Sequence, residues 1–328
     1  MKPNKNIQNF PIFIDGKFYE NNTDIFPSLN PHNEEIWATF SVAGKSEVDL
    51  AIAAARRCLN EGEWPKMLAS DRGKLLLKLA DLIELHANEI GKIETNDSGK
   101  LLAETATQTQ YVAEYYRYFA GLADKIQGST LPIDKPDMHV FTSCEPIGVV
   151  AAVVPWNAQM FLTATKLAPA LAAGCTIIIK ASEIAPCSLL YFARLIKEAG
   201  IPDGVVSVIT GDEKNCAIPL TTHHDIDRIA FTGGPKVAKQ IVINSSENFA
   251  VTTLELGGKS PIVVFEDADI EGAVNGIIAG NYGASGQSCV AGTRVIVHDS
   301  IKKVLVEMLS KRAESIVTGD PKNNETHV

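Results

Sequence analysis

The sequence lacks several features that would assign it to broad protein classes. No apolar run reaches the 18 or so residues that cross a bilayer, and the first residues, MKPNKNIQNFPIFIDGK, lack the apolar core of a signal peptide. Acidic residues outnumber basic ones, 39 to 30, and the net charge of −9 argues against nucleic acid or a membrane surface as a partner. With no internal repeat and 328 residues, the chain is expected to form two domains or one large α/β unit.

Cysteines are few and scattered along the chain. There is no CxxC pair and no Cys/His spacing typical of a metal site, so the sequence predicts no metal centre. Free thiols in a chain of this size are typical of the reducing cytoplasm, which is the expected location. The six are Cys58, Cys144, Cys175, Cys187, Cys216 and Cys289.

The region before residue 147 is predicted to contain short strands followed by helices. The first 45 residues read as strands and turns, and Ser46 and Asp49 occupy capping-box positions at the start of the first helical pattern. Residues 127–146 read as an extended, polar arm rather than core. Apolar residues at helical spacing predict three helices, over residues 46–64, 71–94 and 104–126.

From residue 147 the pattern changes to uniformly apolar strands alternating with amphipathic helices. This pattern predicts an α/β fold class, with a parallel sheet covered on both faces and ligands at the carboxyl ends of its strands. A second α/β run follows the double glycine at 257 and 258. We therefore expect an N-terminal part over 1–257, which contains the first sheet and its helices, and a second α/β part over 258–328.

Residues whose side chains could take part in binding or catalysis follow these strands directly. Taken alone, each has an ordinary interpretation: Asn157 could cap the next helix, and Lys180 with Glu183 could be a surface pair contributing under about 1 kcal/mol. Cys289 is different, because Gly286 and Gly292 flank it where a structural cysteine normally has large apolar neighbours. Such a thiol is accessible to a ligand.

Taken together, five segments resemble the aldehyde dehydrogenase superfamily. They are PWN, KASE, FTGG, LELGGKSP and GQSCVAGTR, in the family's order and spacing, and the resemblance runs from about residue 10 to the end of the chain. It implies a parallel-sheet nucleotide-binding domain and a second α/β catalytic domain, which is incomplete here. It also implies oxidation of an aldehyde to a carboxylic acid through a cysteine thiohemiacetal and a thioester.

The resemblance implies three catalytic residues. Cys289 matches the nucleophile, Asn157 matches the amide that donates to the oxyanion, and Glu255 matches the base that activates water for thioester hydrolysis. A donor to an oxyanion typically contributes about 3 kcal/mol to the transition state. The histidine nearest in sequence to the thiol is His298, expected on a strand, so a Cys–His hydrolase is the weaker alternative.

A cofactor site is implied although the chain contains no GxGxxG motif. Glu183 would accept from the adenine ribose hydroxyls and repel a 2′-phosphate, so NAD is preferred, with NADP possible because Lys180 offsets the repulsion. Gly233 and Gly234 would open a helix facing the pyrophosphate. The residues implied to bind the cofactor are Pro155, Trp156, Lys180, Glu183, Gly211, Gly233, Gly234, Leu256 and Gly257.

The chain departs from the family pattern in three places. Gly234 stands where a serine is usual, and the segment from Gly211 to Ala217 lacks a second glycine. The chain also ends at Val328, about a third short of family members, which are homo-oligomers and use a later strand for association. Two alternatives stay open: an inactive, nucleotide-binding or structural family member, and a CoA-acylating enzyme, which Glu255 argues against.

Overall fold

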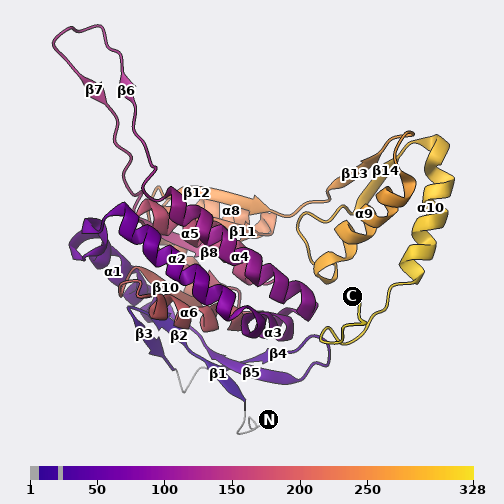
Figure 1. Ribbon diagram of the computed structural model, residues 1–328. Helices are drawn as coiled ribbons and strands as arrows, with labels where there is room; N and C mark the ends of the chain where they lie inside the picture. Colours follow the sequence, from indigo (N-terminus) through magenta and orange to yellow (C-terminus); the bar gives the residue numbers. More distant parts are fainter. Residues whose placement is uncertain (1–6, 21–24) are drawn as a thin grey trace.

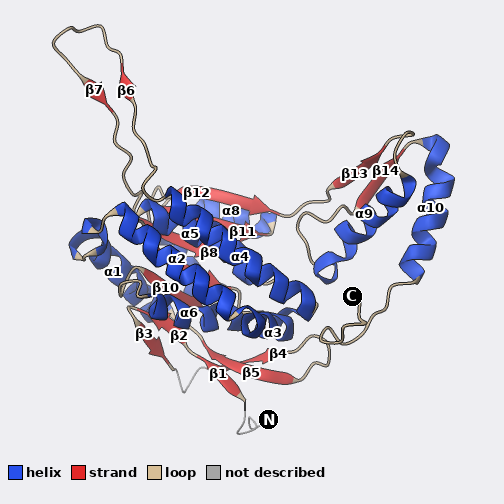
Figure 2. Cartoon of the chain, viewed as in Figure 1, coloured by secondary structure: helices blue, strands red, loops and turns tan. Residues whose placement is uncertain are grey.

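A seven-stranded, mostly parallel sheet forms the centre of the larger part of the molecule (Figures 1 and 2). The computed structural model describes residues 7–20 and 25–328. The strand order is β12–β11–β8–β9–β10–β2–β3, and the first five strands run parallel, which confirms the predicted α/β fold class. The strands are β2 (Ile12–Ile14), β3 (Lys17–Tyr19), β8 (Val149–Val153), β9 (Thr176–Ala181), β10 (Val206–Thr210), β11 (Arg228–Gly233) and β12 (Val251–Leu256).

Helices cover both faces of this sheet, as the uniformly apolar strands require. One face is covered by α5 and α6, with α2, α3 and α4 as a further layer outside them; α1, α7 and α8 cover the other face. Strands β9 and β10 are buried at every position. The helices are α1 (Lys45–Glu61), α2 (Ala69–Leu85), α3 (Ala87–Ser98), α4 (Leu102–Leu122), α5 (Gln159–Ala173), α6 (Cys187–Ala199), α7 (Ile218–Thr222) and α8 (Pro235–Asn244), with short helical turns at Trp64–Lys66 and Glu213–Ala217.

Two predictions on the N-terminal helices are wrong. The helix expected over 71–94 is two helices, because the backbone of His86 leaves the helical region between α2 and α3. The imidazole of His86 lies 3.1 Å from the Tyr191 hydroxyl, and this contact with α6 fixes the bend. The cap of α1 is Gly44 rather than Ser46, and Glu47 closes it by accepting from the Gly44 N–H at 2.9 Å. Asp49 pairs with Lys45 instead.

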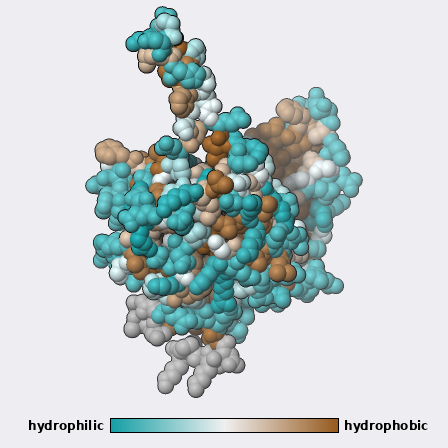
Figure 3. Space-filling model, turned by 60° about the vertical axis from the view of Figure 1, so that its left-hand side comes forward, coloured by the Kyte–Doolittle hydropathy of each residue, from teal (hydrophilic) through white to brown (hydrophobic). Residues whose placement is uncertain are grey.

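Two smaller sheets belong to the N-terminal part. One is formed by β1 (Gln8–Phe10), β5 (Ile36–Ser41) and β4 (Ile25–Leu29). The arm expected over 127–146 is a long hairpin with β6 (Thr130–Leu131) and β7 (Val140–Phe141), and it projects away from the helices (Figures 1 and 3). Its side chains are almost all exposed.

The segment after β12 forms a separate lobe (Figure 1). Its sheet has only two parallel strands, β13 (Pro261–Val264) and β14 (Arg294–Val297), beside α9 (Ile270–Tyr282) and α10 (Asp299–Glu314). Its hydrophobic cluster has three buried members, Val274, Ile277 and Leu305, whereas one large cluster fills the rest of the molecule. Apolar side chains remain on the lobe surface (Figure 3), among them Phe265 at 68 % exposure.

The difference in core size predicts a difference in local stability. Amides of β14 should exchange with solvent by local opening, orders of magnitude faster than those of β8, because few apolar contacts oppose that opening. Hydrogen exchange followed by mass spectrometry measures both in one sample. Equal protection of Arg294–Val297 and Val149–Val153 would show that the lobe is as stable as the central sheet.

Candidate active site

The carboxyl ends of the five parallel strands meet at one edge of the sheet. The strand order changes direction between β8 and β11. Strands β9 and β10 lie on one side of β8, whereas β11 and β12 lie on its other side. Loops on the two sides of such a reversal diverge, and the crevice between them is where open α/β sheets bind ligands. Asn157 follows β8 and Gly234 follows β11, so both lie beside this crevice.

A pocket of about 580 Å³ contains the predicted nucleophile and the predicted base. Cys289 comes from the loop after α9, and Glu255 and Leu256 come from the end of β12; all three line the pocket and are exposed to it. Phe161 of α5 lines it, whereas the preceding residue, Met160, is buried in the core at 1 % exposure. Successive helical residues point about 100° apart, so Met160 turns into the core while Phe161 and Leu162 face the pocket.

Asn157 contacts the cysteine loop directly. Its Nδ2 donates to the carbonyl oxygen of Gln287 at 2.7 Å, two residues before Cys289. An amide nitrogen carries two protons, so this bond uses one of them. The three predicted catalytic residues therefore lie on three segments that meet here: the β8–α5 turn, the end of β12 and the loop after the helical turn Gly283–Gly286.

Lys166 is a pocket residue that sequence reasoning missed. It lies on α5, is 9 % exposed, and its Nζ donates to the Thr232 hydroxyl at 2.6 Å. Burial lowers the pKa of Lys166 to about 8, against the attraction of the Glu255 carboxylate, which raises it. The available signal was a single lysine inside the apolar stretch FLTATKLAPALAAG.

Residues predicted to bind the cofactor lie along the same edge. Lys180 is buried in β9, and its Nζ contacts the Glu183 carboxylate at 2.7 Å, while Glu183 itself is half exposed. Gly233 ends β11, and Gly234 is the N-cap of α8 with open space where a side chain would be. The start of a helix leaves backbone N–H groups without partners, here from Lys236 onward because Pro235 has none, so this helix start is a candidate anion site.

The remaining cofactor candidates surround this edge. Pro155 and Trp156 follow β8, and Trp156 is 36 % exposed. Gly257 follows β12 in open space. Gly211 is buried directly after β10, and a Cβ there would lie 2.6 Å from the Ala43 carbonyl oxygen, so the close approach of the two loops requires glycine.

The histidines do not take part in this arrangement. His298 lies just beyond β14, not on it as expected, and its Nδ1 contacts Ser300 Oγ at 2.8 Å at the start of α10. His223, His224 and Asp225 place three ligand atoms within 4.8 Å of one another, but they precede β11 at the opposite end of the sheet. Arg56 already lies 3.7 Å from the Asp225 carboxylate and competes with any cation there.

Comparison with known proteins agrees with this geometry. The sequence profile of the aldehyde dehydrogenase family matches residues 18–328. The chain belongs to the aldehyde dehydrogenase family. It is 52 % identical over 320 residues to (Z)-2-((N-methylformamido)methylene)-5-hydroxybutyrolactone dehydrogenase of Acinetobacter baylyi, an alignment covering 98 % of this chain and 65 % of that one. It is 39 % identical over 316 residues to betaine aldehyde dehydrogenase of Bacillus subtilis, an alignment that covers 96 % of this chain and 64 % of that one.

Solved aldehyde dehydrogenase structures share the fold. The NAD⁺ complex of the aldehyde dehydrogenase from Bacillus cereus superposes with a TM-score of 0.95 at 40 % identity, over 97 % of this chain and 65 % of that one. The NAD⁺ complex of betaine aldehyde dehydrogenase from Staphylococcus aureus superposes with a TM-score of 0.95 at 36 % identity, over 98 % of this chain and 64 % of that one. The chain thus spans about 65 % of the length of the relatives it matches. Within the described residues, no helix is long and apolar enough to cross a membrane.

The exposure of the thiols predicts how they react. Cys289 and Cys144 are exposed, and the other four are buried. Under native conditions iodoacetamide should label Cys289 first, then Cys144, whose thiol donates to the Gln127 carbonyl at 3.3 Å. Peptide mapping of the native protein and of Cys289→Ala measures this order. Labelling of Cys175 or Cys187 as fast as Cys289 would contradict the structure.

Proposed function

We propose that this family member oxidises an aldehyde to a carboxylic acid with NAD and water, releasing the acid, reduced cofactor and a proton. The observation that carries the proposal is the shared pocket of Cys289 and Glu255, with Asn157 bonded to the cysteine loop. A thiol and a carboxylate on opposite segments of one pocket provide a nucleophile and a base for two successive steps. NAD⁺ complexes of similar structures support the cofactor.

In the first step the sulfur of Cys289 attacks the aldehyde carbon. The carbonyl oxygen gains the electron pair and becomes an oxyanion, which preorganised donors stabilise. Asn157 is the side-chain donor proposed for this oxyanion. Its bond to the Gln287 carbonyl fixes the amide beside the cysteine loop before any substrate binds.

In the second step Glu255 activates water. Its carboxylate takes a proton from the water, the water oxygen bonds to the acyl carbon of the thioester, and the Cys289 sulfur leaves. The glycines at 257 and 258 have open space around them, which allows the end of β12 to adjust. Lys166 lies buried in the same pocket, where the Glu255 carboxylate attracts its positive charge.

The residues at the strand edge fit a dinucleotide. The Lys180–Glu183 pair offers an acceptor and a donor for ribose hydroxyls, and the uncovered N-terminus of α8 at Gly234 suits the pyrophosphate. When bound, NAD supplies the hydride acceptor that converts the cysteine adduct to a thioester. The exposed carboxylate of Glu183 repels a 2′-phosphate, which supports NAD over NADP.

For the substrate we propose an uncharged aldehyde. The pocket wall is mostly apolar, with Phe161, Leu162 and Val290 among its side chains, and the charge of Lys166 opposes that of Glu255 within it. Such a wall offers no net charge near the thiol to attract a substrate with a fixed charge. We also propose that the domain boundary lies at residues 257–258. The free thiols support a location in the cytoplasm. We further propose that the whole protein self-associates.

The two steps can be separated with Glu255→Gln, which keeps the size of the side chain but removes the base. Mixing with aldehyde and NAD should give a single burst of reduced cofactor followed by slow turnover, because the thioester accumulates. Stopped-flow absorbance measures the burst, and Glu247→Gln, another exposed glutamate, is the matched control. Steady turnover at the original rate in Glu255→Gln would mean that another residue is the base. The proposed activity would be refuted if the unsubstituted protein showed neither burst nor turnover with a panel of aldehydes.

Cofactor choice should depend on Glu183. Glu183→Gln removes the repulsion of a 2′-phosphate and should narrow the NAD preference by about 1–3 kcal/mol, the contribution of a charge-assisted hydrogen bond. The ratio of kcat/KM for NAD and NADP measures the change, with the exposed Glu307→Gln on α10 as a control. An unchanged ratio would mean that Lys180 and Glu183 form a surface ion pair only.

A further inference from the structure

The loop that carries Cys289 contains an unfavourable backbone turn. Three consecutive residues, Ala284, Ser285 and Gly286, adopt the left-handed region, with φ of 55°, 54° and 73°. Residues with a Cβ avoid this region, so two of the three are held there against their own preference. Contacts from outside the cysteine loop, residues 283–289, must therefore maintain the turn.

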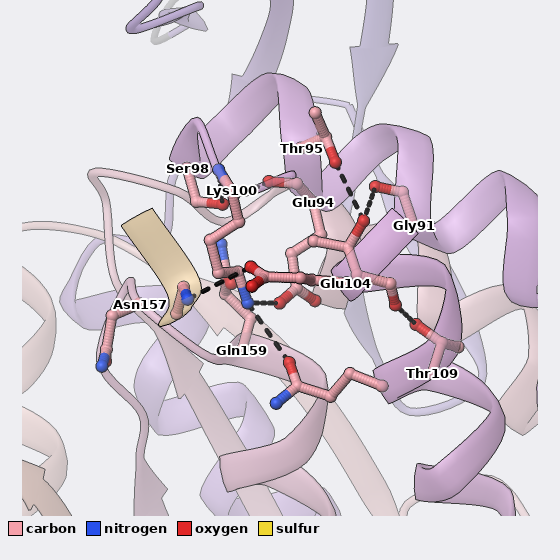
Figure 4. A network of polar contacts seen from close by, with 12 residues as sticks. Gly91, Glu94, Thr95, Ser98, Lys100, Glu104, Thr109, Asn157 and Gln159 are labelled. Carbon is pink, nitrogen blue, oxygen red and sulfur yellow. Dashed lines mark hydrogen bonds and ion pairs between the residues drawn. The ribbon is translucent and has the colours of Figure 1, made fainter. Parts of the chain in front are cut away.

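These contacts come from the junction of α3 and α4. The Ala284 N–H donates to Glu104 Oε2 at 3.1 Å, and Ser285 Oγ donates to the Gly99 carbonyl at 3.2 Å. Gln287 Nε2 donates to the Ser98 carbonyl at 3.1 Å. Figure 4 shows the Glu104 carboxylate beside the cysteine loop, with Asn157 close to the same stretch of backbone.

The α3–α4 junction is itself rigid. Lys100 and Glu94 form an ion pair whose side chains are 2 % and 1 % exposed, and Ser98 Oγ donates to the Glu94 carbonyl at 2.6 Å (Figure 4). Gly99 ends α3 in the left-handed conformation and turns the chain into α4. A buried pair satisfied in this way holds its segment firmly, so the groups that receive the cysteine loop have fixed positions.

We propose that Glu104 is a positioning residue for Cys289: its carboxylate fixes the left-handed turn at Ala284 and so sets the cysteine opposite Asn157. The catalytic meaning of this role rests on the proposed function, but the contact itself does not. Glu104 acts through the backbone and does not line the pocket.

The surroundings of Glu104 suit this role. The side chain is partly buried, and burial raises its pKa, while the Ala284 N–H and the Lys100 charge favour the ionised form and lower it. A carboxylate that accepts from a backbone N–H makes a stronger bond than a neutral acceptor. The other two contacts use carbonyl acceptors, so Glu104 provides the only charged acceptor among the three.

The test uses the 328-residue protein and three variants: Glu104→Ala, Glu104→Gln and Glu114→Ala. Glutamine keeps an oxygen that can accept from the Ala284 N–H, so Glu104→Gln should retain much of the contact that Glu104→Ala loses. Glu114 is the matched control, because it lies on the same helix and its exposed carboxylate pairs only with Arg117 at 2.6 Å among the described contacts. Hydrogen exchange of residues 283–289 is the primary measurement, and thermal unfolding reports global stability.

We expect exchange in the cysteine loop to rise on the order of tenfold in Glu104→Ala and less in Glu104→Gln, whose neutral oxygen keeps the bond but not its charge. Exchange in Glu114→Ala should stay close to that of the unsubstituted protein, and the unfolding midpoints should not change. With an aldehyde substrate, kcat should fall in Glu104→Ala and recover in Glu104→Gln, without change in KM for NAD. Unchanged loop exchange, or faster exchange throughout the molecule with a lower midpoint, would overturn the positioning role. If no variant oxidises any aldehyde, the proposed function fails, while loop exchange still decides the role of Glu104.

Discussion

The parallel run of five strands is the constraint on which the candidate site depends. Because β8, β9, β10, β11 and β12 point the same way, every loop that follows one of them emerges at one edge. Asn157, Glu183, Gly234 and Glu255 are up to 98 positions apart in sequence, from 157 to 255, yet they lie along this edge without any direct bond between them. An antiparallel arrangement of the same strands would place half of these residues at the opposite edge of the sheet.

The position of Cys289 depends on a different kind of contact. Its own lobe has a core of three buried side chains and a two-stranded sheet, which is too little structure to position a loop accurately. The loop is instead bonded to the larger part of the molecule through Asn157, Glu104 and the carbonyls at the end of α3. Such polar contacts are directional, so a small lobe can present a cysteine at a defined place while its outer strands remain weakly supported.

Sequence reasoning predicted the parts of this fold that depend on local pattern. The apolar runs at 149–153 and 176–181 are buried strands. The catalytic roles of Cys289, Glu255 and Asn157, which five short motifs imply, stay a prediction. The break at His86 was not predicted, because the apolar spacing continues across it and only a tertiary contact with Tyr191 reveals the bend. Lys166 and Glu104 were missed for the same reason: each is an ordinary helical residue until the fold brings Glu255 or Ala284 beside it.

The absence of a GxGxxG motif follows from how the strand edge is divided. In the common dinucleotide fold the glycines lie in the turn after the first parallel strand, where the pyrophosphate approaches the backbone. Here that turn, after β8, carries Trp156 and Asn157, and Asn157 is bonded to the cysteine loop. The uncovered helix start with glycine lies across the strand reversal, at Gly234 after β11. A pyrophosphate received there would leave Asn157 of the β8 turn beside the cysteine loop, with Pro155 and Trp156 of the same turn still available to the rest of the cofactor.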